Sequence, residues 1–150
     1  MKQILLIIAF VTFSLVAYSQ NKEIIKTDKA PVPIAPYSQG IKANGFLFVS
    51  GQIGLNPINR KLVESGVEAE TIQIMENIKA VLSAGGATMK DIVSTTVYLK
   101  NIDDFAKMNE IYGRYFNENF PTRSTVGVSN LAGNANIEIT VTALLPLKKK

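Results

Sequence analysis

The sequence predicts an α+β fold, in which a mixed six-stranded sheet carries two helices packed on one of its faces. Three observations lead to this prediction. The patterns follow one another in the order three strands, helix, strand, helix, two strands. Two stretches carry apolar residues at helical spacing. The last strand alternates regularly between an apolar face and a more polar one.

The N-terminus predicts a secretory signal peptide over residues 1–19. Lys2 supplies one positive charge, an apolar run follows from Ile4 to Val16, and the small residues Ala17 and Ser19 precede a polar segment. The run is shorter than the roughly 20 residues that a helix needs to cross a bilayer. The pattern therefore indicates export, to the periplasm or the medium.

The predicted cleavage site follows Ser19, with Gln20 as the alternative. An uncleaved N-terminus buried as a helix or strand is the competing interpretation. Residues 20–150 are long enough for one domain with its own core.

The first half of the predicted domain is mostly extended. A first strand is predicted at 23–26, and a proline-punctuated segment then runs to residues 37–40. Asn44-Gly45 predicts a hairpin turn before a strand at 46–50. Gly51 and Gly54 interrupt the pattern after that strand.

Two helices follow. Ile74, Ile78, Val81 and Leu82 form one apolar stripe, and Gly85-Gly86 is typical of a helix end. The second helix is predicted to begin near Asp103-Asp104, where acidic residues favour the positive end of the dipole. Its predicted inner face consists of Phe105, Met108, Tyr112, Tyr115 and Phe116.

The remaining strands are predicted at 91–100, 124–130 and 136–145. In the last, one face carries Ile137, Ile139, Val141, Ala143 and Leu145, and the other carries Glu138, Thr140, Thr142 and Leu144. A sheet covered by helices on one side only leaves its other face in need of a partner. We therefore expect the chain to associate with itself.

Composition excludes several function classes. The chain has 16 basic and 12 acidic residues, but removal of Lys2 and of the terminal Lys148–Lys150 leaves a neutral body without a basic face for nucleic acid. It contains no cysteine and no histidine, which excludes Ser-His-Asp and Cys-His mechanisms and Cys/His zinc sites. The acidic residues are scattered, and we predict no metal site.

Two charges stand in segments that otherwise predict buried strand: Arg123 within 120–125 and Glu138 within 136–140. A buried charge is costly unless it is paired or functional. A guanidinium binds a carboxylate bidentately, and a nearby carboxylate can transfer protons to and from water. The pair predicts a site for a small anionic metabolite. A structural ion pair between Arg123 and Glu138 is the alternative.

Six motifs span the predicted domain: Ala35–Gly40, Val49–Ile53, Thr95–Lys100, Phe105–Asn109, Pro121–Ser124 and Ile137–Ile139. Together, and in this order, they resemble the YjgF/RidA family. The resemblance implies a chorismate-mutase-like subunit, a homotrimer around a barrel-like centre, and ligand clefts between subunits. It also implies hydrolysis, without a cofactor, of reactive enamines and imines such as 2-aminoacrylate and 2-iminopropanoate to 2-oxo acids and ammonia.

The resemblance also assigns roles to individual residues. Arg123 matches the arginine that holds the substrate carboxylate, and Glu138 matches the acid that positions water and carries protons. The matching substrate-binding positions are Tyr37, Ser50, Gly51, Asn109 and Thr125.

Most of the other positions have a structural alternative. Tyr37 could be a core tyrosine with a bonded hydroxyl, Ser50 and Gly51 a plain bulge or turn, and Asn109 a surface or capping residue. Gln52 could serve only local backbone groups.

The sequence departs from the family at two positions. Thr125 stands where many members have cysteine. Because the backbone at this position can bind the ligand whatever the side chain, we expect the change only to tune the activity. Leu131 is followed by Ala132-Gly133, where proline is frequent, which predicts a looser loop.

Two other functions compete with the deaminase. One is an exported, non-catalytic trimer that binds small ligands or acts as a chaperone. The other is ribonuclease activity, which the neutral body and the missing histidine disfavour.

Overall fold

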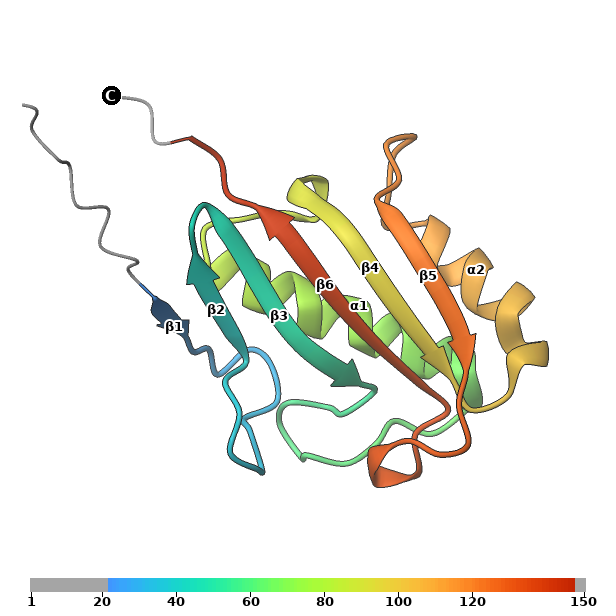
Figure 1. Ribbon diagram of the computed structural model, residues 1–150. Helices are drawn as coiled ribbons and strands as arrows, with labels where there is room; N and C mark the ends of the chain where they lie inside the picture. Colours follow the sequence, from blue (N-terminus) through green and yellow to red (C-terminus); the bar gives the residue numbers. More distant parts are fainter. Residues whose placement is uncertain (1–21, 148–150) are drawn as a thin grey trace, which may run out of the picture.

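The computed structural model describes residues 22–147, and a mixed sheet forms its centre (Figure 1). The strands lie in the order β1-β2-β3-β6-β4-β5, and all neighbours are antiparallel except β4 and β5, which are parallel. This confirms the predicted mixed six-stranded sheet. The predicted signal peptide and its cleavage site lie outside the described residues. The strands are β1 Glu23–Ile25, β2 Gly40–Ala43, β3 Phe46–Ile53, β4 Ile92–Leu99, β5 Thr122–Gly127 and β6 Ile137–Leu144.

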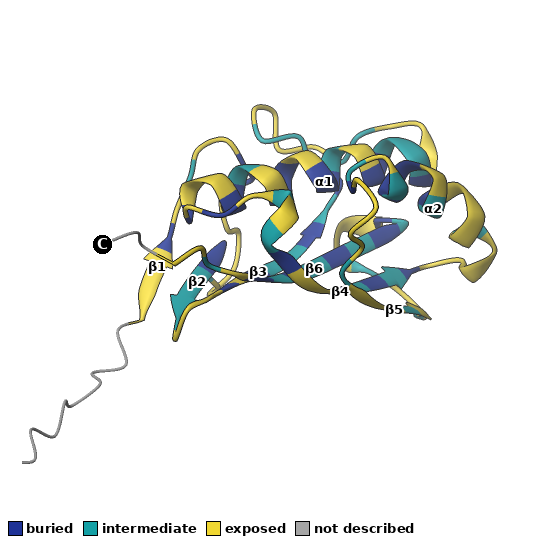
Figure 2. Cartoon of the chain, turned by 90° about the horizontal axis from the view of Figure 1, so that it is seen from above, coloured by how far each residue is buried: buried dark blue, intermediate teal, exposed yellow. Residues whose placement is uncertain are grey.

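Both helices cover the same face of the sheet, as predicted (Figure 2). Helix α1 spans Gly66–Ala84 and helix α2 spans Phe105–Gly113. Helix α1 ends at the predicted glycine pair, where Gly86 has a φ of +79° that a side chain would strain. Among residues 22–147, neither helix combines the length and apolar composition that a membrane span requires. Three short 3₁₀ helices complete the structure: η1 Met89–Asp91, η2 Ile102–Asp104 and η3 Ala132–Asn134.

The predicted hairpin joins β2 to β3. Asn44 and Gly45 both have positive φ, 50° and 80°, as a type I′ turn requires. Ala43 consequently faces Phe46, and the register of both strands is set.

The alternation of β6 divides the core from the open face of the sheet. Ile137, Ile139, Val141 and Ala143 are buried beneath the helices, whereas Leu144 is exposed on the other side. The open face continues on β3, where Phe46 and Phe48 are also exposed. The predicted division of the last strand into two faces is therefore confirmed.

Several expectations for these elements differ from the structure. Strand β3, predicted at 46–50, continues through Gly51 to Ile53, because the glycine lies in a bulge and does not end the strand. The segment expected to end at residues 37–40 leads instead into β2, which begins at Gly40 because that residue is the first to pair with β3. Helix α2 ends at Gly113, so Tyr115 and Phe116 follow it in a turn. Phe105, predicted on the inner face, begins the helix and is exposed.

Strand β5 departs furthest from the prediction. It begins at Thr122 and ends at Gly127, short of the expected residue 130, and it forms one edge of the sheet. None of its residues is buried. The prediction that Arg123 stands in a buried strand is therefore wrong.

A close contact joins the end of β3 to α1. A Cβ atom on Gly54 would lie 2.8 Å from Cα of Glu70, within the backbone of the helix. The Glu70 side chain is itself buried, and its carboxylate accepts hydrogen bonds from the backbone N–H and the side-chain amide of Asn136. Asn136 immediately precedes β6 and lies two residues before Glu138, so its hydrogen bonds to Glu70 fix the start of that strand.

We expect Gly54→Ala to destabilise the protein, because the helix backbone must shift to admit a methyl group. The free energy of unfolding should fall by about 1–3 kcal/mol, the usual cost of overpacking. Gly113→Ala is the matched control, since a Cβ atom there meets nothing within 4 Å, and it should change stability by no more than about 0.5 kcal/mol. Urea unfolding followed by circular dichroism measures both, and equal stability of the two variants would contradict this account.

Candidate functional site

The predicted site residues divide into two groups on opposite faces of the sheet. Strand β4 lies between β5 and β6, and it pairs Thr95 with Arg123 and Tyr98 with Glu138. Thr95 is buried beneath the helices, so Arg123 lies on the helix-covered side, whereas Glu138 alternates with the buried residues of β6 and lies on the open side. One chain therefore does not bring the two charges together.

We call the first group the Glu138 half-site: Tyr37, Ser50, Gly51 and Glu138. These residues line a cavity of about 390 Å³, whose walls also include Ile34, Ile53, Leu55 and Ala132. A few polar side chains within mainly apolar walls are typical of a ligand site.

A β-bulge shapes this half-site. The register between β3 and β6 shifts between Val49 and Gln52, so Ser50 and Gly51 lie in the bulge. The Ser50 hydroxyl donates to the carbonyl of Ser38 at 2.6 Å, which ties the Tyr37 segment to β3. Gln52 donates to the Ser50 carbonyl at 3.0 Å, and it thus serves local backbone, as its alternative interpretation proposed.

Gly51 leaves room for the Glu138 carboxylate. A Cβ atom at Gly51 would overlap Oε1 of Glu138 and would lie 2.8 Å from its Cδ. The resemblance assigned Gly51 to substrate binding, and in the structure the space beside it holds the Glu138 carboxylate itself.

The Glu138 carboxyl has no partner among residues 22–147: it takes part in no hydrogen bond or ion pair there. Burial raises its pKa above the ordinary value of 4.5. A carboxyl group whose pKa moves toward neutrality can both accept and return a proton.

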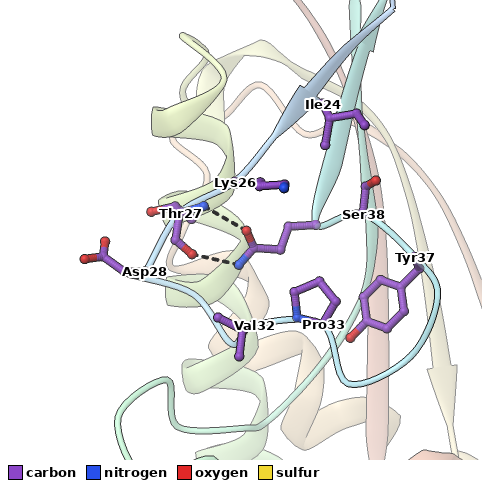
Figure 3. Close-up of a pocket in the computed structure, with 9 residues that line it drawn as sticks. Ile24, Lys26, Thr27, Asp28, Val32, Pro33, Tyr37 and Ser38 are labelled. Carbon is purple, nitrogen blue, oxygen red and sulfur yellow. Dashed lines mark hydrogen bonds between the residues drawn. The ribbon is translucent and has the colours of Figure 1, made fainter.

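Tyr37 lies between two cavities. Its side chain is 46% exposed and its hydroxyl has no hydrogen-bond partner among the described residues, so the alternative of a bonded core tyrosine is wrong. On its other side is an open cavity of about 620 Å³, which Lys26, Asp28 and Pro33 help to line (Figure 3). The buried amide of Gln39 in this wall is occupied by backbone groups of Thr27, Ala30 and Pro31.

We call the second group the Arg123 half-site: Asn109 and Arg123, with Tyr112, Phe120 and Pro121. They line a cavity of about 340 Å³ between α2 and the start of β5. Asn109 is half-buried in the middle of α2 and caps neither end of it. Thr125 lies on the same side of β5 as Arg123, opposite Val97, but it lines neither half-site.

Aromatic rings hold the Arg123 guanidinium. Its Cζ atom lies 4.7 Å from the ring centroid of Tyr112 and 5.7 Å from that of Phe105. No ion pair joins Arg123 to Glu138 in the described chain, so the structural ion pair is not formed. Both aromatics were expected in the core. Phe105, Asn109 and Tyr112 are nevertheless spaced i, i+4, i+7, which places them on one helix face.

The described residues offer no metal centre, since residues 22–147 contain no cluster of three or more acidic side chains. The polar groups of the two half-sites are a cation, a carboxyl with raised pKa, an amide, the Ser50 hydroxyl and the phenols of Tyr37 and Tyr112. These groups can bind a carboxylate and transfer protons.

Comparison with protein families matches residues 27–145 to the model described as Endoribonuclease L-PSP. Reactive Intermediate Deaminase A, chloroplastic, of Arabidopsis thaliana is 44% identical over 136 residues, covering 91% of this chain and 73% of that protein. The 2-iminobutanoate/2-iminopropanoate deaminase of Dermatophagoides farinae is 42% identical over 118 residues, covering 79% of this chain and 92% of that protein.

The fold also matches solved structures. The crystal structure of E. coli TdcF with bound serine has a TM-score of 0.79 and 35% sequence identity, covering 83% of this chain and 99% of that one. This likeness agrees with the chorismate-mutase-like fold that the resemblance implied.

We expect Glu138→Gln to stabilise the protein at neutral pH. Because burial raises the pKa of Glu138, the folded protein binds that proton more tightly than the unfolded chain does. The contribution of this proton to the free energy of unfolding is complete below the pKa that Glu138 has in the unfolded chain. It is lost as pH rises through the pKa that Glu138 has in the folded protein. Glutamine stays neutral and avoids this loss, so the variant should be the more stable one at pH 7, with the difference disappearing below the ordinary value of 4.5.

Thermal unfolding across this pH range measures the effect. Glu64→Gln, which alters an exposed carboxyl, controls for the loss of one charge. A Glu138→Gln protein that is less stable than wild type at neutral pH would show instead that the carboxylate has a stabilising partner.

Proposed function

The chain belongs to the YjgF/RidA family, and from this membership we propose that it is a hydrolytic deaminase of small imines and enamines that bear a carboxylate. The substrates would be of the 2-aminoacrylate and 2-iminopropanoate type, and the products a 2-oxo acid and ammonia. The observation that carries the proposal is the Arg123 guanidinium, which takes part in no side-chain hydrogen bond or ion pair among residues 22–147. Its N–H groups are available for a ligand carboxylate.

The proposed reaction needs only water and the groups described above. Arg123 holds the substrate carboxylate, and Glu138 accepts a proton from water while the water oxygen bonds to the imine carbon. Glu138 returns that proton to nitrogen, giving a carbinolamine. Transfer of the hydroxyl proton to nitrogen then allows the C–N bond to break, so that ammonia leaves and the carbonyl of the 2-oxo acid forms. Tyr37 closes one side of the cleft.

We propose further that the site is completed between subunits. Arg123 and Glu138 lie on opposite faces of one sheet, and the open face carries exposed apolar residues, among them Phe46, Phe48 and Leu144. In the homotrimer that the family resemblance implies, the Arg123 half-site of one subunit would meet the Glu138 half-site of the next. A cyclic assembly of this kind repeats the same contact at each interface.

The ligand of one relative supports the size and charge of the proposed substrate. The structure of E. coli TdcF contains serine, a small molecule with one carboxylate and one nitrogen on the adjacent carbon. A 2-imino acid has the same arrangement, with a planar carbon. We propose that the Arg123 half-site takes a carboxylate of this kind.

Arg123→Ala should abolish most of the activity, because it removes both N–H contacts to the carboxylate. We expect kcat/KM to fall at least about a hundredfold, which corresponds to roughly 3 kcal/mol of transition-state stabilisation. An amino-acid oxidase acting on alanine or 2-aminobutanoate supplies the imine, and the release of ammonia and 2-oxo acid is measured. Arg123→Lys retains the charge but not the planar fork, so its kcat/KM should lie between those of the wild-type protein and Arg123→Ala.

Normal turnover by Arg123→Ala would remove the basis of the proposal. A folded wild-type protein that binds 2-oxo acids without accelerating imine hydrolysis would favour the non-catalytic binding protein instead.

Mixed oligomers test whether the site is shared. Arg123→Ala and Glu138→Gln subunits are each inactive alone, but in a mixed oligomer some interfaces combine an intact Arg123 with an intact Glu138. Random assembly from equal amounts should restore about a quarter of the wild-type activity, because each interface draws both of its subunits independently. Co-expression with two affinity tags isolates the mixed trimers. One of their three interfaces is intact, so the purified mixed trimers should show about a third of the wild-type activity. Mixtures no more active than their components would show that each site lies within one chain.

A further inference from the structure

A buried hydrogen bond lies behind the Arg123 half-site. The Tyr112 hydroxyl donates to Oγ1 of Thr95 at 3.1 Å, and the two side chains are only 3% and 2% exposed. Thr95 is the residue of β4 that lies directly beside Arg123 of β5. The ring of Tyr112 is therefore fixed at its hydroxyl end by the strand next to the one that carries the arginine.

The face of this fixed ring supports the guanidinium. The Cζ atom of Arg123 lies 4.7 Å from the Tyr112 centroid, within the range of a cation–π contact, and Phe105 adds a second ring at 5.7 Å. An aromatic face attracts the guanidinium through its π system and occupies none of its five N–H donors. The arginine is thereby held with its hydrogen-bonding edges free.

Arg114, one residue beyond α2, shows the opposite arrangement. Its guanidinium forms an ion pair with Glu110 one helical turn earlier, which occupies a donor edge. A carboxylate beside Arg123 would likewise compete with the carboxylate of a ligand. An aromatic support avoids this competition.

We propose that Tyr112, anchored by Thr95, is a positioning residue that presents the N–H edge of Arg123 to the ligand carboxylate. This inference rests on the proposed function only in taking a carboxylate as the ligand. Tyr112 acts through the arginine, because its own side chain is almost completely buried.

The protonation state of Tyr112 agrees with this role. Burial raises the pKa of its hydroxyl, and this effect exceeds the lowering by the Thr95 hydrogen bond and by the nearby Arg123 charge. Tyr112 therefore remains neutral at physiological pH. The contact with Arg123 is one between a cation and a neutral ring, and it does not neutralise the guanidinium.

Binding of 2-oxobutanoate, measured by calorimetry without turnover, tests the proposal. Tyr112→Leu removes the ring face and should weaken binding about five- to tenfold, in line with a cation–π contact at a partly exposed site. Tyr112→Phe keeps the face and loses only the anchor to Thr95, and it should weaken binding about twofold or less. In steady-state assays the loss in Tyr112→Leu should appear mainly as a higher KM, with kcat changed less.

Phe116→Leu is the matched control. Phe116 is also buried, at 8% exposure, and its ring packs against Tyr112 with centroids 4.8 Å apart, but it does not contact Arg123. This variant should lose stability as a core substitution does and yet bind 2-oxobutanoate like wild type. If Tyr112→Leu does not fold, Phe105→Leu replaces it, because Phe105 is exposed and its loss should still weaken binding about twofold.

Three results would overturn the proposal. The first is that Tyr112→Leu, or Phe105→Leu in its place, binds 2-oxobutanoate as tightly as wild type. The second is equal weakening by Phe116→Leu, and the third is a lack of 2-oxobutanoate binding by the wild-type protein. A protein that fails to hydrolyse imines but shows the expected dependence on Tyr112 would refute the deaminase and support the positioning role. The two proposals can therefore fail separately.

Discussion

The two-residue alternation of side chains along the sheet is the constraint on which the arrangement of the site depends. Within the sheet, β5 and β6 flank β4, and the register sets Arg123 beside Thr95 and Glu138 beside Tyr98. A slip of one residue in either strand would turn its charge to the other face, and in β6 it would also bring apolar core residues out. The same register that buries the core therefore keeps the two charges apart, and it makes a second copy of the chain necessary for the site that we propose.

Within residues 22–147, each charge is kept unpaired in a different way. Arg123 is exposed on an edge strand, and aromatic faces restrict it without occupying its donors. Glu138 lies in the space that Gly51 leaves, where partial burial raises the pKa of its carboxyl. An ion pair between the two would satisfy both groups and close the site. Their separation leaves each free to interact with a ligand or with water, at the cost of desolvating a carboxylate without a partner.

The sequence predicts those parts of the fold that local chemistry determines. The Asn44-Gly45 turn, the end of α1 at Gly85-Gly86 and the two faces of β6 follow from backbone preference and periodicity, and the structure has all three. The position of β5 depends on which strand it pairs with, and its own residues do not reveal this. The same limitation explains why Arg123 was expected in a buried strand.

The site was predictable residue by residue but not as an arrangement. The motifs identify Arg123 and Glu138, yet their relation across the sheet depends on the parallel pairing of β4 with β5 and the antiparallel pairing of β4 with β6. The aromatic support was missed because apolar residues at helical spacing were all assigned to the core. Phe105 shows that the first turn of α2 projects beyond the core, over the edge strand.

The two half-sites also differ in how firmly the fold holds them. Strand β6 has a neighbour on each side, and its start is fixed by the buried Glu70 through Asn136, so the backbone of Glu138 is well restrained. Strand β5 has one neighbour and no buried residue, and such strands open locally at lower free energy than central ones. A guanidinium on that strand needs support from outside the sheet if it is to hold one geometry. Tyr112 supplies this support from α2 and, through Thr95, connects it to the adjacent strand, so the side-chain contacts compensate for the weaker backbone position.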